Sequence, residues 1–223
     1  MPLNDEIQQE ILAYCDKDLP SDEYTEKLFD FIDDKKLRER IHLEYYAARY
    51  IYKLGEALSV KEERLHAHVK FQIVQYAGIY EALIVWMLWD KFSDHAAVAA
   101  IEFHPALRKA ATLPQTVNLT SNTGEQIILC TETREKTSRI SIKFDDKVDA
   151  AVQIGFLHKP LGEEIKSFYK LRNAIHLESA VKNEITYEIA NSQLAYRRIL
   201  PFTRGLKGFL KNNKLPPEAK IKI

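Results

Sequence analysis

The chain is poor in the residues that build disulfide scaffolds, metal sites and flexible linkers. Its 223 residues include two cysteines, Cys15 and Cys130, with 7 glycines and 8 prolines. Two cysteines exclude a disulfide framework, and no CxxC or Cys/His spacing suits zinc. A Gly-rich phosphate loop, a Gly-x-Ser-x-Gly elbow and an HExxH motif are also missing. We therefore expect no metal and no cofactor, and a reducing, cytoplasmic location.

The chain also lacks a net charge and an apolar run of membrane length. Its 32 basic and 32 acidic residues balance, so no global attraction to nucleic acid or anionic lipid follows. The most apolar run, IYEALIVWMLW at residues 79–89, is too short to span a bilayer and contains Glu81. The acidic start, MPLNDEIQQE, has no apolar core of a signal peptide. We expect no membrane partner.

Charge is nevertheless distributed unevenly along the chain. Residues 1–40 hold 12 acids and 6 bases, whereas residues 195–223 hold 8 bases and one acid. A basic end of this kind predicts binding of phosphate or of an acidic partner surface, with Arg197, Arg198 and Arg204 as the candidate phosphate ligands. A solvated helix face followed by a frayed tail is an equally good interpretation.

Apolar residues recur at helical spacing over most of the chain. The strongest pattern lies between residues 60 and 92, and its second half, YAGIYEALIVWMLW, is apolar nearly all round. Such a helix belongs in the centre of a bundle or at a dimer interface. We predict helices over residues 3–16, a short one from 21, and then 36–58, 60–92, 95–102, 145–156, 160–177 and 187–210.

One segment changes to the alternating, β-branched pattern of strands. Residues 116–120, 126–131 and 139–144 alternate, with a turn at Asn122-Thr123-Gly124 between the first two. We read residues 116–144 as a small β-hairpin or three-stranded insert. The predicted fold is therefore mainly α: one helical-bundle domain over residues 1–223, with an N-terminal helical extension at 1–35.

The stretch SFYKLRNAIHLES, residues 167–179, places three polar side chains in a half-apolar helical run. In a continuous helix, Arg172 and His176 share a face because they are four residues apart, and Asn173 lies beside His176. The trio flanks the apolar stripe of the same helix, so it is expected at the edge of a core or groove. A satisfied structural Arg/His pair is the competing interpretation.

The stretch IKSFYKLRNAIHLE, residues 165–178, resembles the HEPN superfamily (higher eukaryotes and prokaryotes nucleotide-binding domains). It follows KVDAAVQIGFLHKPLGEE, a helix ending in a Gly-hydrophobic turn, which that family also tends to have. Residues 68–88, HVKFQIVQYAGIYEALIVWML, resemble the family's central helix, with Glu81 where a polar residue is common. The resemblance covers residues 36–210.

The resemblance implies an RNA-binding protein that cleaves RNA without a metal, as a homodimer whose Arg and His residues meet in a shared cleft. Arg172 would hold the scissile phosphate, His176 would act as general base or acid, and Asn173 would orient the imidazole or bind a phosphate oxygen. Glu81 is a possible supporting residue. The resemblance also implies a role as a toxin or in antiphage defence, with an antitoxin or other protein as partner.

One feature departs from the family pattern. The usual motif has four to six residues between Arg and His, whereas three separate Arg172 from His176 here. The alternative function is accordingly a non-catalytic, HEPN-like dimerisation or protein-interaction module. In that case the central apolar helix dimerises, and the acidic start and basic end recognise partners.

Overall fold

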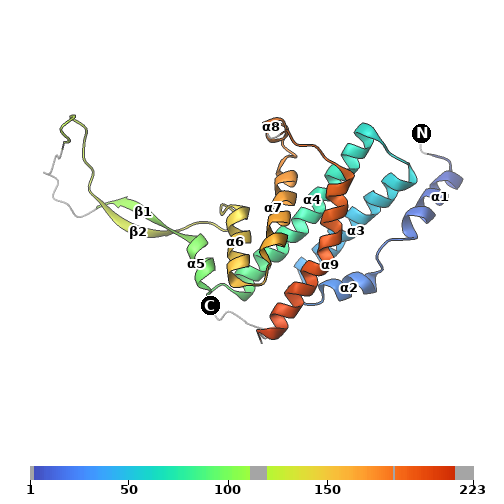
Figure 1. Cartoon of the computed structure of the whole chain (residues 1–223), viewed down its shortest axis with the longest axis horizontal. Coiled ribbons are helices and arrows are strands. Elements are labelled where there is room, and N and C mark those ends of the chain that lie inside the picture. Colours follow the sequence, from blue (N-terminus) through green and yellow to red (C-terminus); the bar gives the residue numbers. More distant parts are fainter. Residues whose placement is uncertain (1–2, 111–119, 183, 214–223) are drawn as a thin grey trace.

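Helices dominate the computed structural model, which describes residues 3–110, 120–182 and 184–213 (Figure 1). That part of the chain forms a helical bundle with one small antiparallel hairpin, as the sequence predicts. The elements are α1 (Asp5–Asp16), α2 (Asp22–Phe29), α3 (Lys35–Ala57), α4 (Glu62–Trp86), the π-helix η1 (Met87–Lys91), α5 (Ala96–Glu102), β1 (Phe103–Lys109), β2 (Cys130–Lys136), α6 (Phe144–Ile154), α7 (Lys159–Asn173), α8 (Leu177–Lys182) and α9 (Ile189–Asn212).

Side-chain caps fix where the first three helices begin. The side chains of Asn4, Ser21 and Asp34 accept hydrogen bonds from the backbone N–H three residues later, at 2.9, 3.2 and 3.0 Å. Each bond satisfies one of the N–H groups that a helix leaves unpaired at its start. The helix boundaries at this end of the chain are therefore encoded locally.

The long helix α4 is the centre of the bundle and packs against α3, α6, α7 and α9 (Figure 1). It is long and apolar enough, together with η1, to cross a membrane, but 61% of its most apolar window is buried inside the bundle. Trp86 at the end of α4 and Trp89 in η1 are almost completely enclosed. Its hydrophobicity is thus explained by packing within the chain.

The N-terminal residues contribute to the same hydrophobic core as the later helices. Leu28, Phe29 and Ile32 are buried there, and Phe29 meets Tyr45 of α3 edge to face, with ring centroids 5.8 Å apart. Further along the chain, the buried Tyr80 hydroxyl of α4 donates a 2.6 Å hydrogen bond to the Ala195 carbonyl of α9. These contacts tie the N-terminal residues to α3 and the C-terminal helix α9 to α4.

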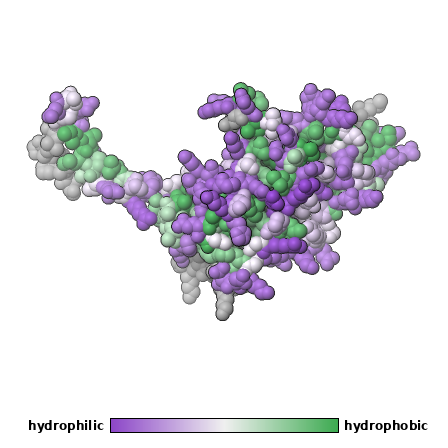
Figure 2. Space-filling view, viewed as in Figure 1, coloured by the Kyte–Doolittle hydropathy of each residue, from purple (hydrophilic) through white to green (hydrophobic). Residues whose placement is uncertain are grey.

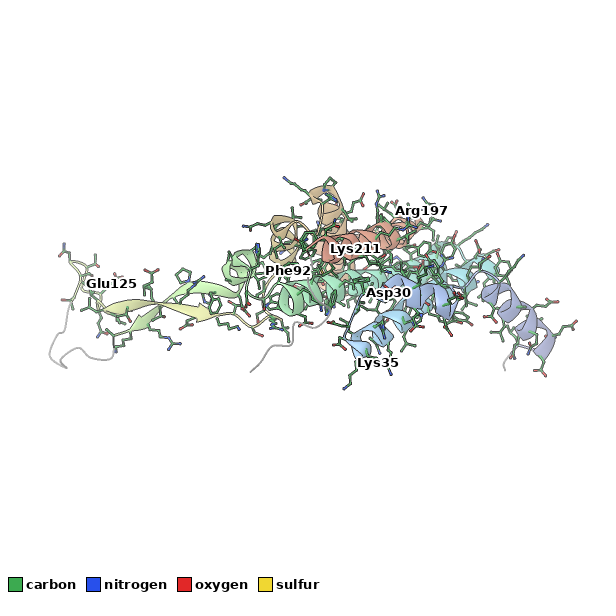
Figure 3. The ribbon with its side chains drawn as sticks, turned by 90° about the horizontal axis from the view of Figure 1, so that it is seen from below. Asp30, Lys35, Phe92, Glu125, Arg197 and Lys211 are labelled. Atoms are coloured by element: carbon green, nitrogen blue, oxygen red, sulfur yellow. The ribbon has the colours of Figure 1, made fainter. Side chains whose placement is uncertain are left out.

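The hairpin extends away from the bundle as an arm, defined here as residues 103–109 and 120–136 (Figures 1 and 3). Its register runs from Phe103 opposite Lys136 to Lys109 opposite Cys130. Apolar side chains on it are open to solvent, and Figure 2 shows them as hydrophobic surface on the outer arm. These are Leu107, Ile127, Ile128 and Leu129.

The strands lie at other residues than predicted. Residues 103–109 form β1 although they follow α5 directly and contain Pro105, which a two-stranded sheet tolerates because both strands are edges. Of the predicted strands, 126–131 overlaps β2 at its end, and Thr120 makes only an isolated bridge with Gln126. Residues 116–119 lie outside the described part. Residues 139–144 are not a strand: they form a turn, and Phe144 begins α6.

Candidate functional site

Helix α7 carries the Arg-Asn motif and is held by its apolar face. Pro160 lies in its first turn, where a missing N–H costs no hydrogen bond. Ile165 and Phe168 are buried against the core, and the Phe168 ring stacks on Tyr80 of α4 with centroids 5.7 Å apart. This packing sets the rotation of α7 and directs Tyr169 and Arg172 along the α4 side of the bundle.

Helix α7 ends at Asn173, earlier than predicted. The N–H of Ala174 bonds to the carbonyls of Lys170 and Leu171, which tightens the last turn. The Leu171 carbonyl also accepts a 2.9 Å hydrogen bond from the hydroxyl of Tyr187. A side chain from the segment before α9 therefore helps to terminate α7.

The early end of α7 separates Arg172 from His176. His176 lies beyond the helix, is exposed, and its carbonyl accepts from Ala180 N–H at the start of α8. The prediction that both residues lie one turn apart on a single helix face is therefore wrong. His176 is reachable from solvent, but it does not line the pocket that Arg172 faces.

Arg172 is held by three polar neighbours. Its Nη2 lies 3.6 Å from Glu81 Oε2, and its Nη1 donates to Asn173 Oδ1 at 3.1 Å and to the Tyr169 hydroxyl at 3.5 Å. The Tyr169 hydroxyl donates in turn to Glu81 Oε1 at 3.4 Å. Tyr169 is fixed from its other side by the Phe144 ring, stacked at 4.0 Å. The structure thus brings Arg172, Asn173 and Glu81 together.

The Arg172 cluster forms one wall of an open pocket between α4, α6 and α7. The pocket has a volume of about 450 Å³ and is lined by three cations and one acid. Helix α4 forms another wall, which includes Gly78. A Cβ added at Gly78 would meet no atom within 4 Å. The lining residues are Gly78, Glu81, Ala82, Val85, Arg139, Ile140, Lys147, Tyr169 and Arg172.

Lys147 is the most unusual member of this pocket. It is 5% exposed and makes no ion pair among the described residues. Burial lowers the pKa of its ammonium group, and the carboxylate of Glu81 offsets part of that effect. Its Nζ lies 5.8 Å from the centroid of the Trp89 ring, and the Arg139 guanidinium lies over the same ring at 5.4 Å.

Sequence reasoning did not identify Lys147 or Arg139. A signal for Lys147 was present: it shares one helical face with Phe144, Val148 and Ala151, all of which are buried. A lysine at an otherwise apolar helix position indicates a buried cation that needs a partner. Arg139 has no comparable signal, because it lies in a turn and joins the pocket only through tertiary contact.

The three arginines predicted near the C-terminal end have different surroundings. Arg198 is paired with Glu164 of α7, with its Nε and Nη2 2.5 and 2.7 Å from the carboxylate oxygens. Arg204 is exposed, and Arg197 lines a separate cavity beside α3 and α4. The acidic and basic ends also meet within the chain, since Lys207 Nζ lies 2.7 Å from Asp30.

Across the described residues, no group of three or more His, Cys, Asp or Glu side chains is placed to hold a metal ion. Comparison with known proteins gives no assignment. No protein-family model matches the chain, and no curated protein or solved structure matches it either.

Proposed function

We propose that this chain is a HEPN-like RNA-binding protein whose pocket between α4, α6 and α7 binds a backbone phosphate. The observation that carries the proposal is the convergence of Arg139, Lys147 and Arg172 on one open pocket that contains a single acid, Glu81. Phosphate groups supply the negative charge that such a pocket lacks. The pocket lies beside the Arg-Asn motif on which the resemblance rests.

The surroundings of two of the three cations, Lys147 and Arg172, suit a phosphate ligand. The Lys147 ammonium is poorly hydrated and has no ion-pair partner among the described residues, which costs free energy. A phosphate that enters the pocket would supply the missing negative charge. The guanidinium of Arg172 is positioned by Tyr169 and Glu81, and its fork can bind two phosphate oxygens. Glu81 then keeps the guanidinium in place while the ligand is absent.

RNA cleavage requires a proton-transferring group near the scissile phosphate, and His176 is the candidate. RNA supplies the 2′-hydroxyl nucleophile, so one imidazole to remove its proton and cations to stabilise the phosphorane are sufficient. Because His176 lies outside the pocket of its own chain, the proposed nuclease is a homodimer in which the imidazole of one chain serves the pocket of the other.

Exposed apolar side chains beside His176 support such a dimer. Ile175, Leu177 and Val181 are 39%, 78% and 79% exposed, and all three lie at the turn after α7 or on α8. Large apolar side chains grouped in this way favour contact with another chain. A two-fold interface here would place His176 of each chain beside the last turn of α7 of the other, which carries Arg172.

RNA binding is tested by fluorescence anisotropy with a labelled single-stranded RNA at two salt concentrations. We expect Arg172→Gln to weaken binding by about tenfold or more, because it removes a charged phosphate contact. Lys170→Gln is the matched control: it removes the same charge from an exposed position of α7 and should change affinity little. Equal losses in the two variants would contradict a localised site.

A second variant closes the pocket without changing its charge. Gly78→Leu adds a side chain where the pocket wall is open, and leucine also favours the helix. We expect it to reduce RNA affinity as strongly as Arg172→Gln, with helical content and melting temperature retained. Full RNA affinity in this variant would exclude the pocket.

Cleavage is tested separately by incubating RNA with the protein in excess EDTA. We expect degradation by the wild type and none by His176→Ala, which should keep its RNA affinity and melting temperature because the residue is exposed. RNA binding without cleavage would reject the nuclease and leave the binding proposal intact.

The arm favours a second function, that of a non-catalytic interaction module. Leu107 and Ile128 are 75% and 53% exposed on a hairpin whose two strands, within the described part of the chain, pair only with each other. Edges of this kind pair with strands of partner chains. Loss of partner binding on removal of the arm, with RNA affinity unchanged in Arg172→Gln, would favour this function over the first.

A further inference from the structure

The two strands of the arm each have one edge that faces away from the hairpin. Figures 1 and 3 show the arm projecting clear of the helices in the described part of the chain. Within that part the sheet consists of β1 and β2 alone, so each outer edge carries backbone N–H and C=O groups that pair with no further strand. Edges of this kind are where an additional strand attaches.

The hydrogen bonds at the two ends of the hairpin fix which backbone groups of β2 face outward. The N–H of Thr137 donates to the Glu102 carbonyl at 2.7 Å, and the N–H of Ala110 donates to the Leu129 carbonyl at 3.0 Å. In an antiparallel ladder, hydrogen-bonded pairs alternate with non-hydrogen-bonded pairs. Every second residue of β2 therefore directs its backbone groups away from β1. These outward residues are Cys130, Glu132, Arg134 and Lys136.

The two outer edges are not equally able to accept a strand. Pro105 of β1 lies opposite Arg134, so it is one of the outward positions of β1. Proline has no N–H and leaves a gap in any ladder formed on that edge. Strand β2 contains no proline, and each of its outward residues offers both a donor and an acceptor. The β2 edge is therefore the one open to another strand.

Two oppositely charged side chains on β2 have no ion pair among the described residues. Glu135 and Lys136 each form one within the chain, at 2.6 and 3.0 Å. Glu132 and Arg134 do not, although both are exposed and project from the same face of the strand. The Arg134 guanidinium lies over the Phe103 ring at 5.2 Å, a contact that supplies no carboxylate. A strand with a base opposite Glu132 and an acid opposite Arg134 would pair both charges.

We propose that β2 pairs antiparallel with β2 of a second copy of this chain, around a two-fold axis at Thr133. In this register Glu132 lies opposite the partner's Arg134, and symmetry repeats the pair on the other side of the axis. Both pairs fall at outward positions, where the new ladder forms its hydrogen bonds. The two arms together then form one four-stranded antiparallel sheet.

The neighbouring registers are disfavoured by charge. The backbone pattern requires outward residues to lie opposite each other, so the next registers centre the axis on Glu132 or on Arg134. The first places two glutamates directly opposite each other, and the second places two arginines there. Like charges at such positions are destabilising. The register centred on Thr133 avoids both repulsions.

The same register also brings exposed apolar side chains against the second chain. Leu129 continues the ladder beyond β2 and falls opposite the partner's Thr137, so Ile128 and Leu129, 53% and 42% exposed, meet the base of the partner's arm. Covering apolar surface favours association. The proposal rests on the interaction module, the second function proposed above, in using the arm as a binding element, and it names the partner. It requires neither RNA binding nor the contact at α8.

The register is tested by disulfide trapping. The non-hydrogen-bonded pair at the axis brings the Cα atoms of the two Thr133 residues to about 4.5 Å, which a disulfide can bridge. In a Cys130→Ser background, Thr133→Cys should therefore form an intermolecular disulfide in a glutathione redox buffer, detected by non-reducing electrophoresis. The remaining Cys15 is 0% exposed, and α8 carries no cysteine, so trapping reports this contact alone.

Thr131→Cys in the same background is the matched control. Its two copies lie four residues apart along the paired strands, roughly 14 Å, which is too far for a disulfide. Glu132→Arg should slow trapping of the Thr133→Cys chain by about tenfold, because symmetry introduces two like-charge pairs. Adding Arg134→Glu should restore the rate. In the chain without cysteine substitutions, Glu132→Arg should also lower the mass measured by sedimentation equilibrium, and the charge swap should restore it.

Three results would each overturn the self-pairing. They are no disulfide in Thr133→Cys, equal trapping in Thr131→Cys, and a charge swap that restores neither the trapping rate nor the mass. The interaction module is judged separately, by loss of a different partner on removal of the arm. Failure of the self-pairing is therefore distinguishable from failure of that function.

Discussion

Glu164 of α7 and Arg198 of α9 are joined by two parallel hydrogen bonds, with Nε 2.5 Å from Oε2 and Nη2 2.7 Å from Oε1. A guanidinium engaged in this way is not available for a phosphate without losing its carboxylate partner. We therefore assign Arg198 to the packing of α7 on α9. The basic composition of the C-terminal end is a poor guide to which arginine binds a ligand.

Arg198→Gln is expected to leave RNA affinity within a factor of about two, because the charge it removes is already neutralised. A small decrease in melting temperature should accompany it. Anisotropy and thermal denaturation measure the two effects, and Glu164→Gln should produce the same small decrease without weakening RNA binding. A large loss of RNA affinity in Arg198→Gln alone would contradict the assignment.

Lys147→Met is expected to have opposite effects on stability and on binding. Methionine fills similar volume without a buried charge, so the free energy of unfolding at pH 7 should rise by on the order of 1 kcal/mol. RNA affinity should fall, because a phosphate contact is lost. Chemical denaturation and anisotropy on the same preparation measure the two quantities.

The stability difference between Lys147→Met and the wild type should also depend on pH. Burial lowers the pKa of Lys147 in the folded state, so between that pKa and about 10.4 the unfolded wild type binds more protons. In that pH range the free energy of unfolding of the wild type therefore rises relative to that of the variant. The stability gap seen at pH 7 should stay constant until the pH nears the lowered pKa of folded Lys147, and should narrow above it toward about pH 10.4. A gap independent of pH would show that Lys147 is not desolvated.

Gly78→Ala separates helix stability from pocket function. Gly78 lies inside α4, and an added Cβ meets nothing within 4 Å, so alanine should raise the free energy of unfolding by about 0.5–1 kcal/mol. A single methyl group leaves the pocket open, so RNA affinity should be retained. The comparison with Gly78→Leu then attributes any loss in that variant to closure of the pocket. A destabilised Gly78→Ala would contradict the open space seen at this position.

The helices were predictable because they are encoded by local rules. Apolar spacing placed the helices, and caps such as Asn4 and Ser21 fixed where two of them begin. The end of α7 was not predictable. Residues 174–177 continue the helical pattern, and the contact that helps to stop the helix comes from Tyr187, 16 residues away from Leu171. The predicted helix was one turn too long, so His176 was wrongly placed on the same helix face as Arg172.

The site was only partly predictable for a related reason. Arg172 and Asn173 could be found because they are neighbours in the chain, and Glu81 because it interrupts an apolar run. Lys147 and Arg139 join them through tertiary packing around Trp89. Likewise Arg197 and Arg198 are adjacent in the chain, yet one lines a cavity and the other pairs with Glu164. No local pattern separates those two roles.

The arm can be shortened to test whether it contributes to the stability of the bundle. Ala106 and Thr133 face each other in register, so replacing residues 107–132 with Asn-Gly joins them through a two-residue turn of the kind that hairpins favour. We expect the melting temperature to change by no more than about 2 °C, because the described side chains among those removed are mostly exposed and β1 contacts the bundle through α5.

Solubility should change more than stability in the shortened chain. The deletion removes Leu107, Ile127, Ile128 and Leu129, whose exposed side chains favour association. Light scattering at increasing protein concentration should therefore show less aggregation than the wild type, while circular dichroism shows the helical signal preserved. A fall in melting temperature of many degrees would mean that the arm folds back onto the bundle in solution, and the exposed surface assigned to partner binding would then be internal.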